Sequence, residues 1–425
     1  MEGQIKLTSQ ARRARLSGAI RCLLRILLAV MVTLAWLGAA EKPDSESKPP
    51  AKSAPDLAVR KLRWRVFGQR PLGMYYYYPD GRGLESLQQN AAKMNVLAPQ
   101  CFTVGPDGVI EGSIPPAVLE IARREDLPLM PLLINPRFDR GIATALLHDP
   151  KAQERAIIYM AYLAERENFV GWQLDLEFID PADKDLYTQF VRRSAARLHR
   201  DGRLLSVAVV PRFSDTFPGT NSSGGFRTGE WGAPYDYRAL GRIADLMTLM
   251  AYDQHNQSGP PGPVAGHAWM KAALDYAVKR VSREKLLLGF PFYGREWLKT
   301  TEGTQSRTLG YAELSALLAR PGIQVQRDDR WRVPWFQMRD GTTSRTVWFD
   351  DDRSLSEKLE LVVEYRLRGF APWRLGHESP DFWNLLAKIE KSRSGSAAKR
   401  QPTKKTAPRS ARRGIASSRS SSTAK

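Results

Sequence analysis

The chain is poor in cysteine and histidine, and this narrows the chemistry that it can carry. Two cysteines occur among its 425 residues, Cys22 in an N-terminal apolar segment and Cys101 in the body. A disulfide framework and a cysteine-rich zinc site are therefore excluded. The five histidines never occur in an HExxH spacing, so the sequence indicates no metal site and no cofactor.

A long apolar segment without charged residues stands near the start of the chain. Residues 26–40 follow five arginines, carry no charge and end in Leu37-Gly38-Ala39-Ala40. This pattern predicts that residues 1–40 are a signal peptide. The run is shorter than the roughly 20 residues of a membrane span, and a retained N-terminal membrane anchor is the alternative. In either case we expect an exported protein that is periplasmic, extracellular or anchored in the inner membrane.

Acidic residues are absent from the C-terminal end. Of the net charge of +19, residues 1–40 carry +5 and residues 391–425 carry +11, which leaves +3 for residues 41–390. The tail 391–425 and the Pro/Ser/Lys-rich linker 41–60 are predicted to be disordered. The tail suits contact with anionic envelope polymers, whereas nucleic-acid binding is less consistent with export. Residues 61–390 remain as the folded domain.

Eight apolar runs alternate with helical patterns across this domain. The runs are Leu72–Tyr78, Val96–Val104, Leu127–Ile134, Phe169–Phe178, Leu204–Phe213, Asp245–Tyr252, Leu286–Tyr293 and Gly369–Leu375. The helix candidates include Leu84–Lys93, Pro116–Arg124, Lys151–Arg166 and Lys184–His199. Continuous apolar runs are typical of parallel strands buried on both faces. The alternation predicts an α/β fold, a (β/α)8 TIM barrel over residues 61–390.

The alternation of strands and helices is interrupted between the seventh and eighth runs, which are separated by 75 residues. That stretch holds three strand-like segments and a helix, and the segments are Gln324–Gln326, Trp331–Gln337, Arg345–Phe349 and Leu355–Tyr365. We expect a small α+β insertion at about residues 296–366 on the active face. Arg295, Glu296 and Trp297, directly after the seventh run, are either cleft residues or part of a surface loop.

One buried strand carries a polar row. Gln173, Asp175 and Glu177 alternate with apolar residues in the fourth run, so all three project from one face. Burying two carboxyl groups is costly, and such a row belongs at the C-terminal mouth of a barrel, where active sites lie. Glu177, the last of the row, suits a general acid whose pKa is raised by burial and by Asp175. The alternative is a solvated strand end or an ion pair with an arginine.

This row resembles the DxxDxDxE signature of glycoside hydrolase family 18, the chitinase-like barrels, with Asp175 and Glu177 at its last two acidic positions. Four further segments resemble later parts of that family, namely Leu249–Asp253, Leu288–Gly294, Val347–Asp351 and Gly369–Gly376. The resemblance spans about residues 68–390. It is strongest to a bacterial branch that includes spore-cortex-hydrolase-like domains and domains fused to polysaccharide deacetylases and glycosyltransferases.

The resemblance implies roles for individual residues. Glu177 would be the general acid/base, Asp175 would orient the N-acetyl group of the substrate, and Tyr252 would donate a hydrogen bond to its carbonyl. Trp373 would form the floor on which a sugar stacks. Tyr75 lies in a run of four tyrosines, some of which must be core residues. The full substrate-binding set that we predict is Gln173, Met250, Asp253, Trp373, Tyr75 and Tyr293.

Two positions depart from the signature and leave two functions open. Its first two acidic positions are Val170 and Gln173 here, and an amide cannot share a proton with Asp175. The first hypothesis is a hydrolase of β-linked N-acetylglucosamine polymers (chitin-like, peptidoglycan or exopolysaccharide) with a retaining, substrate-assisted mechanism. The second is a catalytically weak or inactive barrel that binds an N-acetylated polysaccharide.

Overall fold

A computed structural model describes residues 66–68, 71–215 and 230–388. The predicted leader 1–40, linker 41–60 and tail 391–425 lie outside these residues. The strands are β1 (Leu72–Tyr77), β2 (Val96–Pro99), β3 (Phe102–Val104), β4 (Ile110–Gly112), β5 (Leu132–Ile134), β6 (Gly171–Asp175), β7 (Leu204–Val209), β8 (Leu246–Met250), β9 (Leu286–Pro291), β10 (Gly294–Thr300), β11 (Gly303–Leu309), β12 (Gln326–Arg327), β13 (Pro334–Asp340), β14 (Thr343–Trp348) and β15 (Gly369–Trp373). The α-helices are α3 (Gly81–Asn90), α4 (Pro116–Arg124), α5 (Arg140–His148), α6 (Pro150–Arg166), α7 (Lys184–Arg200), α8 (Tyr237–Ile243), α9 (His267–Ala277), α10 (Tyr311–Leu318) and α11 (Asp352–Glu364). Within the described part of the chain, no helix is long and apolar enough to cross a membrane.

The main sheet is curled and almost entirely parallel. Its strand order is β2-β1-β15-β9-β8-β7-β6-β5-β3-β4, in which β4 alone is antiparallel to its neighbour. β2, at one end of this order, is followed in the chain by β3 and β4 at the other end, and only Gln100 and Cys101 separate β2 from β3. Leu97 of β2 also forms a parallel bridge with Leu129, just before β5. Since parallel strands run in one direction, their carboxyl ends gather at one edge of the sheet.

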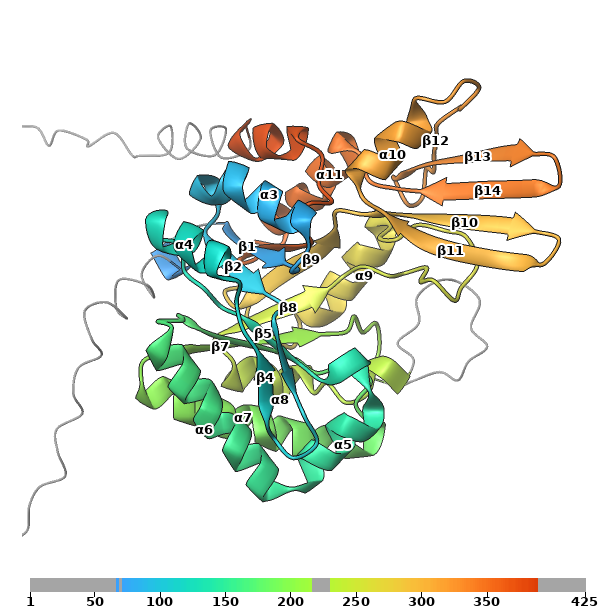
Figure 1. Cartoon of the computed structure of the whole chain (residues 1–425). Coiled ribbons are helices and arrows are strands. Elements are labelled where there is room, and N and C mark those ends of the chain that lie inside the picture. The colour runs from blue at the N-terminus through green and yellow to red at the C-terminus, as the bar shows by residue number, and fades with distance from the viewer. Residues whose placement is uncertain (1–65, 69–70, 216–229, 389–425) are drawn as a thin grey trace, which may run out of the picture. The chain divides into compact units, whose positions relative to one another are not determined.

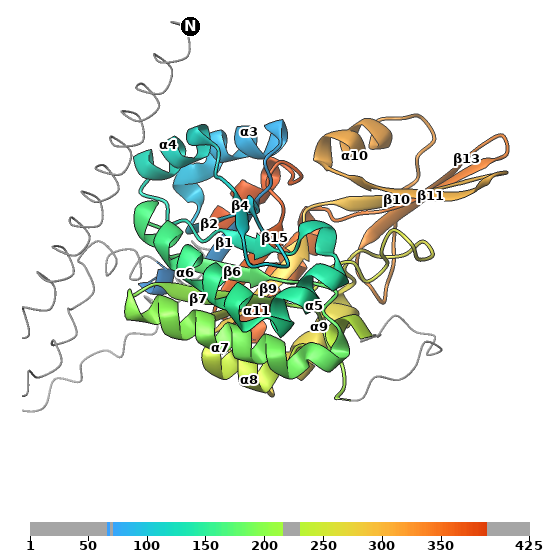
Figure 2. The same cartoon turned by 60° about the horizontal axis from the view of Figure 1, so that its bottom comes forward.

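Apolar side chains fill both faces of the sheet. One cluster lies on the inner, concave face, and its members come from alternate positions of the strands: Leu72, Met74, Tyr76, Val96, Ala98, Met130, Leu132, Val170, Leu204, Leu246, Leu287 and Ala371. A larger cluster lies between the outer face and the helices. Trp172 belongs to this outer layer and donates its indole N–H to the Met160 carbonyl of α6 (2.8 Å). Helices α5, α6 and α7 lie side by side over this face (Figures 1 and 2).

Aspartate N-caps set the starts of several helices. Asp80, Asp139, Asp149, Asp236 and Asp351 precede α3, α5, α6, α8 and α11, and each side chain accepts a backbone N–H of the first turn. Such a cap stabilises a helix by about 1 kcal/mol. Three of these capped helices, α3, α5 and α8, follow a carboxyl end of the parallel sheet, so the caps also fix the loops of that edge.

A second, antiparallel sheet lies between β9 and β15 in the chain, with strand order β11-β10-β14-β13-β12. Its apolar face packs on α10 through Leu309, Leu314, Leu317, Phe336, Val347 and Phe349. It lies with α10 on one side of the parallel sheet (Figures 1 and 2). Residues 295–297, which the sequence left open between cleft and surface loop, belong to β10, and all three are buried.

Each of the eight predicted runs contains a parallel strand, and in six of the eight the strand ends before the apolar run does. The fourth run was expected to reach Phe178, whereas β6 ends at Asp175. Leu176 and Ile179 are nevertheless fully buried, because the loop beyond the strand packs back into the core. The sequence missed β10, β11 and α10. In β11 most residues are polar and exposed, so the strand shows no apolar alternation.

Candidate active site

Asp175 and Glu177 lie at the carboxyl edge of the parallel sheet. Asp175 is the last residue of β6 and is paired with Ile134 of β5. Its side chain is 4% exposed, and among the described residues no hydrogen-bond partner is found for its Oδ1. Glu177 follows in the loop and is half-buried. The next residue, Phe178, adopts a φ of 53°, which turns the chain away from the strand direction.

The two carboxyl groups favour their protonated forms. Burial raises the pKa of Asp175 to about 7. Burial also raises the pKa of Glu177 well above its usual range, and the charges of Asp175 and Asp253 add to this rise. The Trp231 side chain opposes the rise as a hydrogen-bonding neighbour. Both shifts favour retention of a proton by the coupled pair near neutral pH.

Aromatic side chains from three strands converge beside these carboxyls. The Trp373 ring, at the end of β15, lies 5.1 Å from the Tyr76 ring and 6.5 Å from the Tyr252 ring, with the latter pair stacked. Burial raises the pKa of Tyr252 well above its usual range, and the nearby Asp175 and Glu177 reinforce this. Tyr252 is thus a neutral hydrogen-bond donor close enough to both carboxyls to be affected by their charges. The predicted residues Tyr252 and Trp373 lie together with the acidic pair.

Asp253 connects this group to the second sheet. It accepts hydrogen bonds from the Tyr293 hydroxyl (2.6 Å) and from the Arg295 guanidinium (2.9 Å). Arg295 is only 3% exposed and also donates to the His255 carbonyl (3.1 Å). The sequence predicted Asp253 and Tyr293 at the site. Arg295 was named there without a role, and its ion pair depends on a β10 strand that the sequence did not reveal.

Gln173 forms hydrogen bonds with residues of three other strands. It is fully buried, its amide donates to the Tyr76 hydroxyl (2.6 Å), and its carbonyl accepts from Ser206 (3.0 Å) and Thr248 (3.3 Å). These groups belong to β1, β7 and β8, so Gln173 ties three strands together beneath Asp175. No hydrogen bond to Asp175 accompanies them among the described contacts.

Two further predicted residues have different positions. Met250 ends β8, directly before Ala251 and Tyr252, and is 5% exposed. Tyr75 is completely buried, and its ring packs on Phe370 (6.0 Å) and Trp383 (5.2 Å) in the outer core. The structure thus does not bring Tyr75 together with the acidic pair. Because side chains alternate along a strand, Tyr76 faces inward and Tyr75 faces outward.

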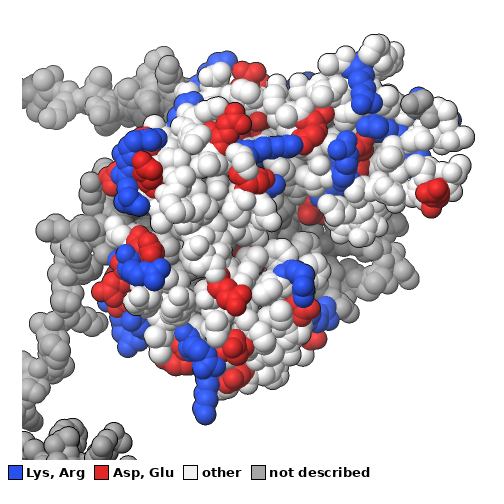
Figure 3. Space-filling view, in the orientation of Figure 1, with Lys and Arg blue, Asp and Glu red and all other residues white. Residues whose placement is uncertain are grey.

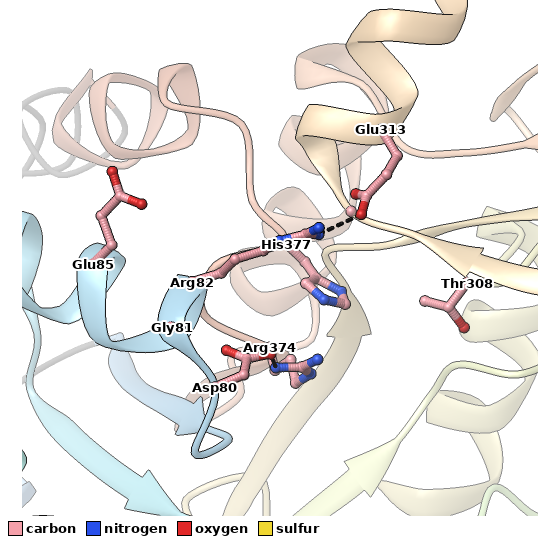
Figure 4. Close-up of a pocket in the computed structure, with 9 residues that line it drawn as sticks. Asp80, Gly81, Arg82, Glu85, Thr308, Glu313, Arg374 and His377 are labelled. Atoms are coloured by element: carbon pink, nitrogen blue, oxygen red, sulfur yellow. Dashed lines mark hydrogen bonds and ion pairs between the residues drawn. The ribbon is translucent and has the colours of Figure 1, made fainter.

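Beside Trp373 and Tyr293 lies an open cleft of about 570 Å³. It joins the loops after β1 and β15 to the start of α10, and its lining residues are Asp80, Gly81, Arg82, Glu85, Thr308, Gly310, Glu313, Arg374 and His377. Figure 4 shows the His377 ring between two ion pairs. These pairs are Arg82–Glu313 (2.5 Å) and Arg374–Asp80 (2.6 Å). The sequence did not indicate this cleft, because its residues come from three distant segments.

The His377 side chain is the most unusual group of this cleft. The residue is 8% exposed, and its Nδ1 is buried with no hydrogen-bond partner among the described residues. Burial lowers the pKa of His377 to about 4, and Arg374 contributes to the decrease. The imidazole is therefore neutral at physiological pH and does not add a charge to the cleft.

The model of glycosyl hydrolases family 18 matches residues 139–378, more than half of the chain. The chain belongs to glycosyl hydrolase family 18. The match includes Asp175, Glu177, Tyr252, Asp253, Tyr293 and Trp373. Membership in family 18 makes the protein a glycosidase, which confirms the enzyme class that the DxxDxDxE-like row predicted.

Relatives and solved structures agree with the family 18 assignment. A cortical fragment-lytic enzyme of Bacillus subtilis is 28% identical over 323 residues, which cover 73% of each chain. The glycosylase YvbX of the same organism is 25% identical over 74% of this chain and 90% of its own. The crystal structure of a chitinase from Chromobacterium violaceum aligns with a TM-score of 0.68 and 28% identity, covering 75% of this chain and 98% of that one.

Proposed function

We propose that this family 18 protein cleaves a β-linked polysaccharide that contains N-acetylglucosamine, with Glu177 as general acid/base and Asp175 and Tyr252 as its partners. The observation that carries the proposal is that buried Asp175 and half-buried Glu177, whose pKa values are both raised, lie beside Tyr252 and Trp373. A carboxyl that stays protonated near neutral pH is what protonation of a glycosidic oxygen requires.

The scaffold that we infer is a closed (β/α)8 barrel with the second sheet as its α+β insertion. Three observations support closure. The strand order begins with β2 and ends with β3 and β4, which follow β2 directly in the chain, and Leu97 of β2 bridges to Leu129 just before β5. The inner cluster also takes residues from β1, β2, β5, β7, β8, β9 and β15, together with Val170 just before β6. In such a barrel the carboxyl edge is the active face. The second sheet reaches this face through the Arg295–Asp253 ion pair.

We propose a retaining, substrate-assisted mechanism. Asp175 ends β6 and Glu177 follows two residues later, at most about 6.6 Å further along an extended chain, so both approach the substrate from the same wall. Neither can therefore be the nucleophile on the far side of the sugar that a two-carboxylate retaining mechanism needs. The acetamido oxygen of the substrate would attack the anomeric carbon while Glu177 protonates the leaving oxygen. Asp175 and Tyr252 would hold the acetamido group, and Glu177 would then deprotonate the attacking water.

The cleft beside Trp373 supports a neutral, hydroxyl-rich polymer as substrate. Arg82 and Arg374 are each neutralised by a carboxylate, and His377 is uncharged. An anionic sugar substituent would have to displace one of these carboxylates. A hydroxyl group, in contrast, both donates and accepts, and so pairs with an intact ion pair. The polymer of the cortical fragment-lytic relative and the chitin of the chitinases both remain candidates.

The test is to offer N-acetylglucosamine oligomers, purified sacculi and a fully de-N-acetylated polymer in parallel, and to follow the first product anomer by NMR. We expect release of reducing ends with retained configuration from N-acetylated substrates. An inverted product, or efficient cleavage of the de-N-acetylated polymer, contradicts the mechanism. Binding to these polymers without cleavage would instead support the second hypothesis, an inactive glycan-binding barrel. The neutral Gln173 network in place of an acidic residue favours that alternative.

We also propose that the protein is exported. The support is the arginine-rich start followed by the uncharged run 26–40. Cell fractionation tests this: the protein is expected in the periplasm, the medium or the inner-membrane fraction. Recovery of the full-length chain from the cytoplasm overturns the proposal. Comparison of the N-terminal residue of the recovered protein with Glu41 then separates cleavage after Ala40 from a retained anchor.

A further inference from the structure

The loop that carries Glu177 is held by a residue that the polar row did not include. Asn135 follows β5 directly, and its side chain is completely buried. Its Oδ1 accepts the backbone N–H of Glu177 (3.0 Å), and its Nδ2 donates to the backbone carbonyl of Glu177 (3.0 Å). One side-chain amide thus satisfies both main-chain polar groups of a single residue.

This contact continues the β5–β6 pairing beyond the point where the strands end. The last backbone pair is Ile134 with Asp175, and the chain turns at Phe178 with its positive φ. Between these points Glu177 has no strand neighbour, and the Asn135 amide supplies the two hydrogen bonds that a neighbouring strand would give. The Nδ2 also donates to the Asp139 carbonyl (2.9 Å), which ties the contact to the start of α5.

Neighbouring contacts fix the rest of the loop but not Glu177 itself. The Tyr235 hydroxyl donates to the Leu176 carbonyl (2.7 Å), and the Phe178 ring stacks on Trp231 at 5.4 Å. Among the described residues, Asn135 is therefore the one whose side chain hydrogen-bonds to the main chain of Glu177. A displacement of about 1 Å at a catalytic group can cost roughly 100-fold in rate, so such a grip has catalytic consequences.

We propose that Asn135 is a positioning residue that holds the general acid Glu177 through its main chain. The proposal rests on the role of Glu177 stated above. An amide is required because the contact needs one acceptor and two donors from a single planar group. Leucine has a similar volume but offers neither, whereas aspartate retains the acceptor for the Glu177 N–H and loses the donors.

Asn135→Leu and Asn135→Asp test the proposal, with Gln153→Leu as matched control. Gln153 is also a buried amide that donates to a backbone carbonyl, that of Leu147 (2.6 Å), but it lies on α6 and does not contact the acidic pair. We expect Asn135→Leu to lower kcat on a fluorogenic N-acetylglucosamine oligomer by about 100-fold with KM nearly unchanged. Asn135→Asp should recover part of this loss, since one of the three hydrogen bonds is retained.

A merely structural role predicts a different outcome. Gln153→Leu and Asn135→Leu would then lower the urea midpoint of unfolding alike, and the folded fraction of each would keep its kcat. Unchanged kcat in folded Asn135→Leu overturns the proposal. Equal losses of kcat in Asn135→Leu and in Gln153→Leu overturn it as well.

Hydrogen exchange on the wild-type protein decides the matter if the variants do not fold. The Glu177 amide proton should exchange slowly, because it is bonded to a buried side chain. An unprotected Glu177 amide contradicts the proposal even if Glu177 is the acid. Conversely, a protected amide in a protein that cleaves no N-acetylated glycan leaves the Asn135 contact intact and refutes the proposed function instead.

Discussion

Asp175 is buried and Glu177 is half-buried next to it, so ionising both carboxyl groups costs free energy. Burial is the main cause of both raised pKa values, and their mutual repulsion adds to that of Glu177. Taking an unpaired carboxylate out of water costs far more than keeping its proton. In the proposed mechanism this retained proton is the one that protonates the glycosidic oxygen, and Asn135 is proposed to position the residue that carries it.

Glu177→Gln is expected to abolish hydrolysis, with a loss of roughly 1,000-fold or more, while glycan binding stays within a few-fold of wild type. The amide keeps the shape of the side chain but has no transferable proton. Initial rates and calorimetric titration with an N-acetylglucosamine oligomer measure the two effects. Asp245→Asn is the matched control, because Asp245 precedes β8 at the opposite edge of the sheet and pairs with His199 (2.7 Å). Unchanged rates in Glu177→Gln remove this residue from the acid role.

The same pKa shifts predict how stability depends on pH. The unfolded chain releases the protons of Asp175 and Glu177 near pH 4, whereas the folded chain holds them to higher pH. The folded state thus binds more protons, so its free energy of unfolding falls as the pH rises from about 4 through the raised pKa values.

Urea unfolding at pH 5 and pH 8 measures this effect in wild type and in Asp175→Asn. We expect the variant to gain stability over wild type at pH 8, by an amount on the order of 1 kcal/mol for each pKa unit removed. At pH 5 the difference should be small. A variant that is less stable than wild type at pH 8 and equal at pH 5 has the opposite sign and contradicts the prediction.

At the scale of elements, two glycines set how closely neighbouring parallel strands approach. Gly171 begins β6 opposite Leu204, and Gly369 begins β15 opposite Leu72. A Cβ at Gly171 would lie 2.1 Å from the Leu204 carbonyl oxygen, and one at Gly369 would lie 1.8 Å from that of Leu72. Both atoms belong to the backbone, so the strands themselves would have to separate.

Gly171→Ala and Gly369→Ala should each destabilise the protein by roughly 2–4 kcal/mol, because a strand pair must open to admit the methyl group. Gly81→Ala, in the first turn of α3, has open space around its Cβ and should be neutral or stabilising by about 0.5–1 kcal/mol. Denaturant unfolding compares the three. Equal stability of all three variants means that these strands are not in close contact.

The second sheet depends on a loop rather than on the parallel strands. Residues of β10 and β11 donate to backbone carbonyls of the segment after β8: Trp297 to Gly259 (2.9 Å) and Ser306 to Gln257 (2.7 Å). With the Arg295–Asp253 pair, these contacts fix the position of the second sheet relative to the acidic pair. Every residue has a backbone carbonyl whatever its side chain is. Hydrogen bonds to such carbonyls therefore leave no motif in the sequence.

For the whole molecule, charge separates the folded domain from the ends of the chain. Figure 3 shows acidic and basic side chains interspersed over the face in view. This agrees with the near-neutral balance of residues 41–390, whereas residues 391–425 contain eleven basic residues and no acid. Attraction to polyanions is therefore expected from the tail and not from this face.

Removal of residues 391–425 should leave the melting temperature and any hydrolysis unchanged and weaken binding to anionic surfaces. The segment offers few apolar groups to bury and carries a charge of +11. Co-sedimentation with anionic vesicles at two salt concentrations measures the binding, and thermal unfolding serves as the control. A large decrease in melting temperature contradicts the prediction, as does equal vesicle binding of the full and the shortened chain.

The sequence by itself determined the alternation of strands and helices, the acidic pair at the end of the fourth run, and the family to which these motifs point. Periodicity and local motifs are properties of neighbouring residues, so they can be read along the chain. The tertiary structure decided that Tyr76 rather than Tyr75 faces inward, that Gln173 binds Tyr76, Ser206 and Thr248, and that Arg295 pairs with Asp253.

Asn135 and the charged cleft are further features that the sequence could not predict. Asn135 lies 42 positions before Glu177, and the cleft joins segments near residues 80, 310 and 375. The register between β5 and β6 places Asn135 beside Glu177, just beyond the last backbone pair of the two strands. Register is a relation between segments distant in the chain, and side-chain hydrogen bonds to backbone atoms leave no pattern in sequence, so only the folded molecule determines them.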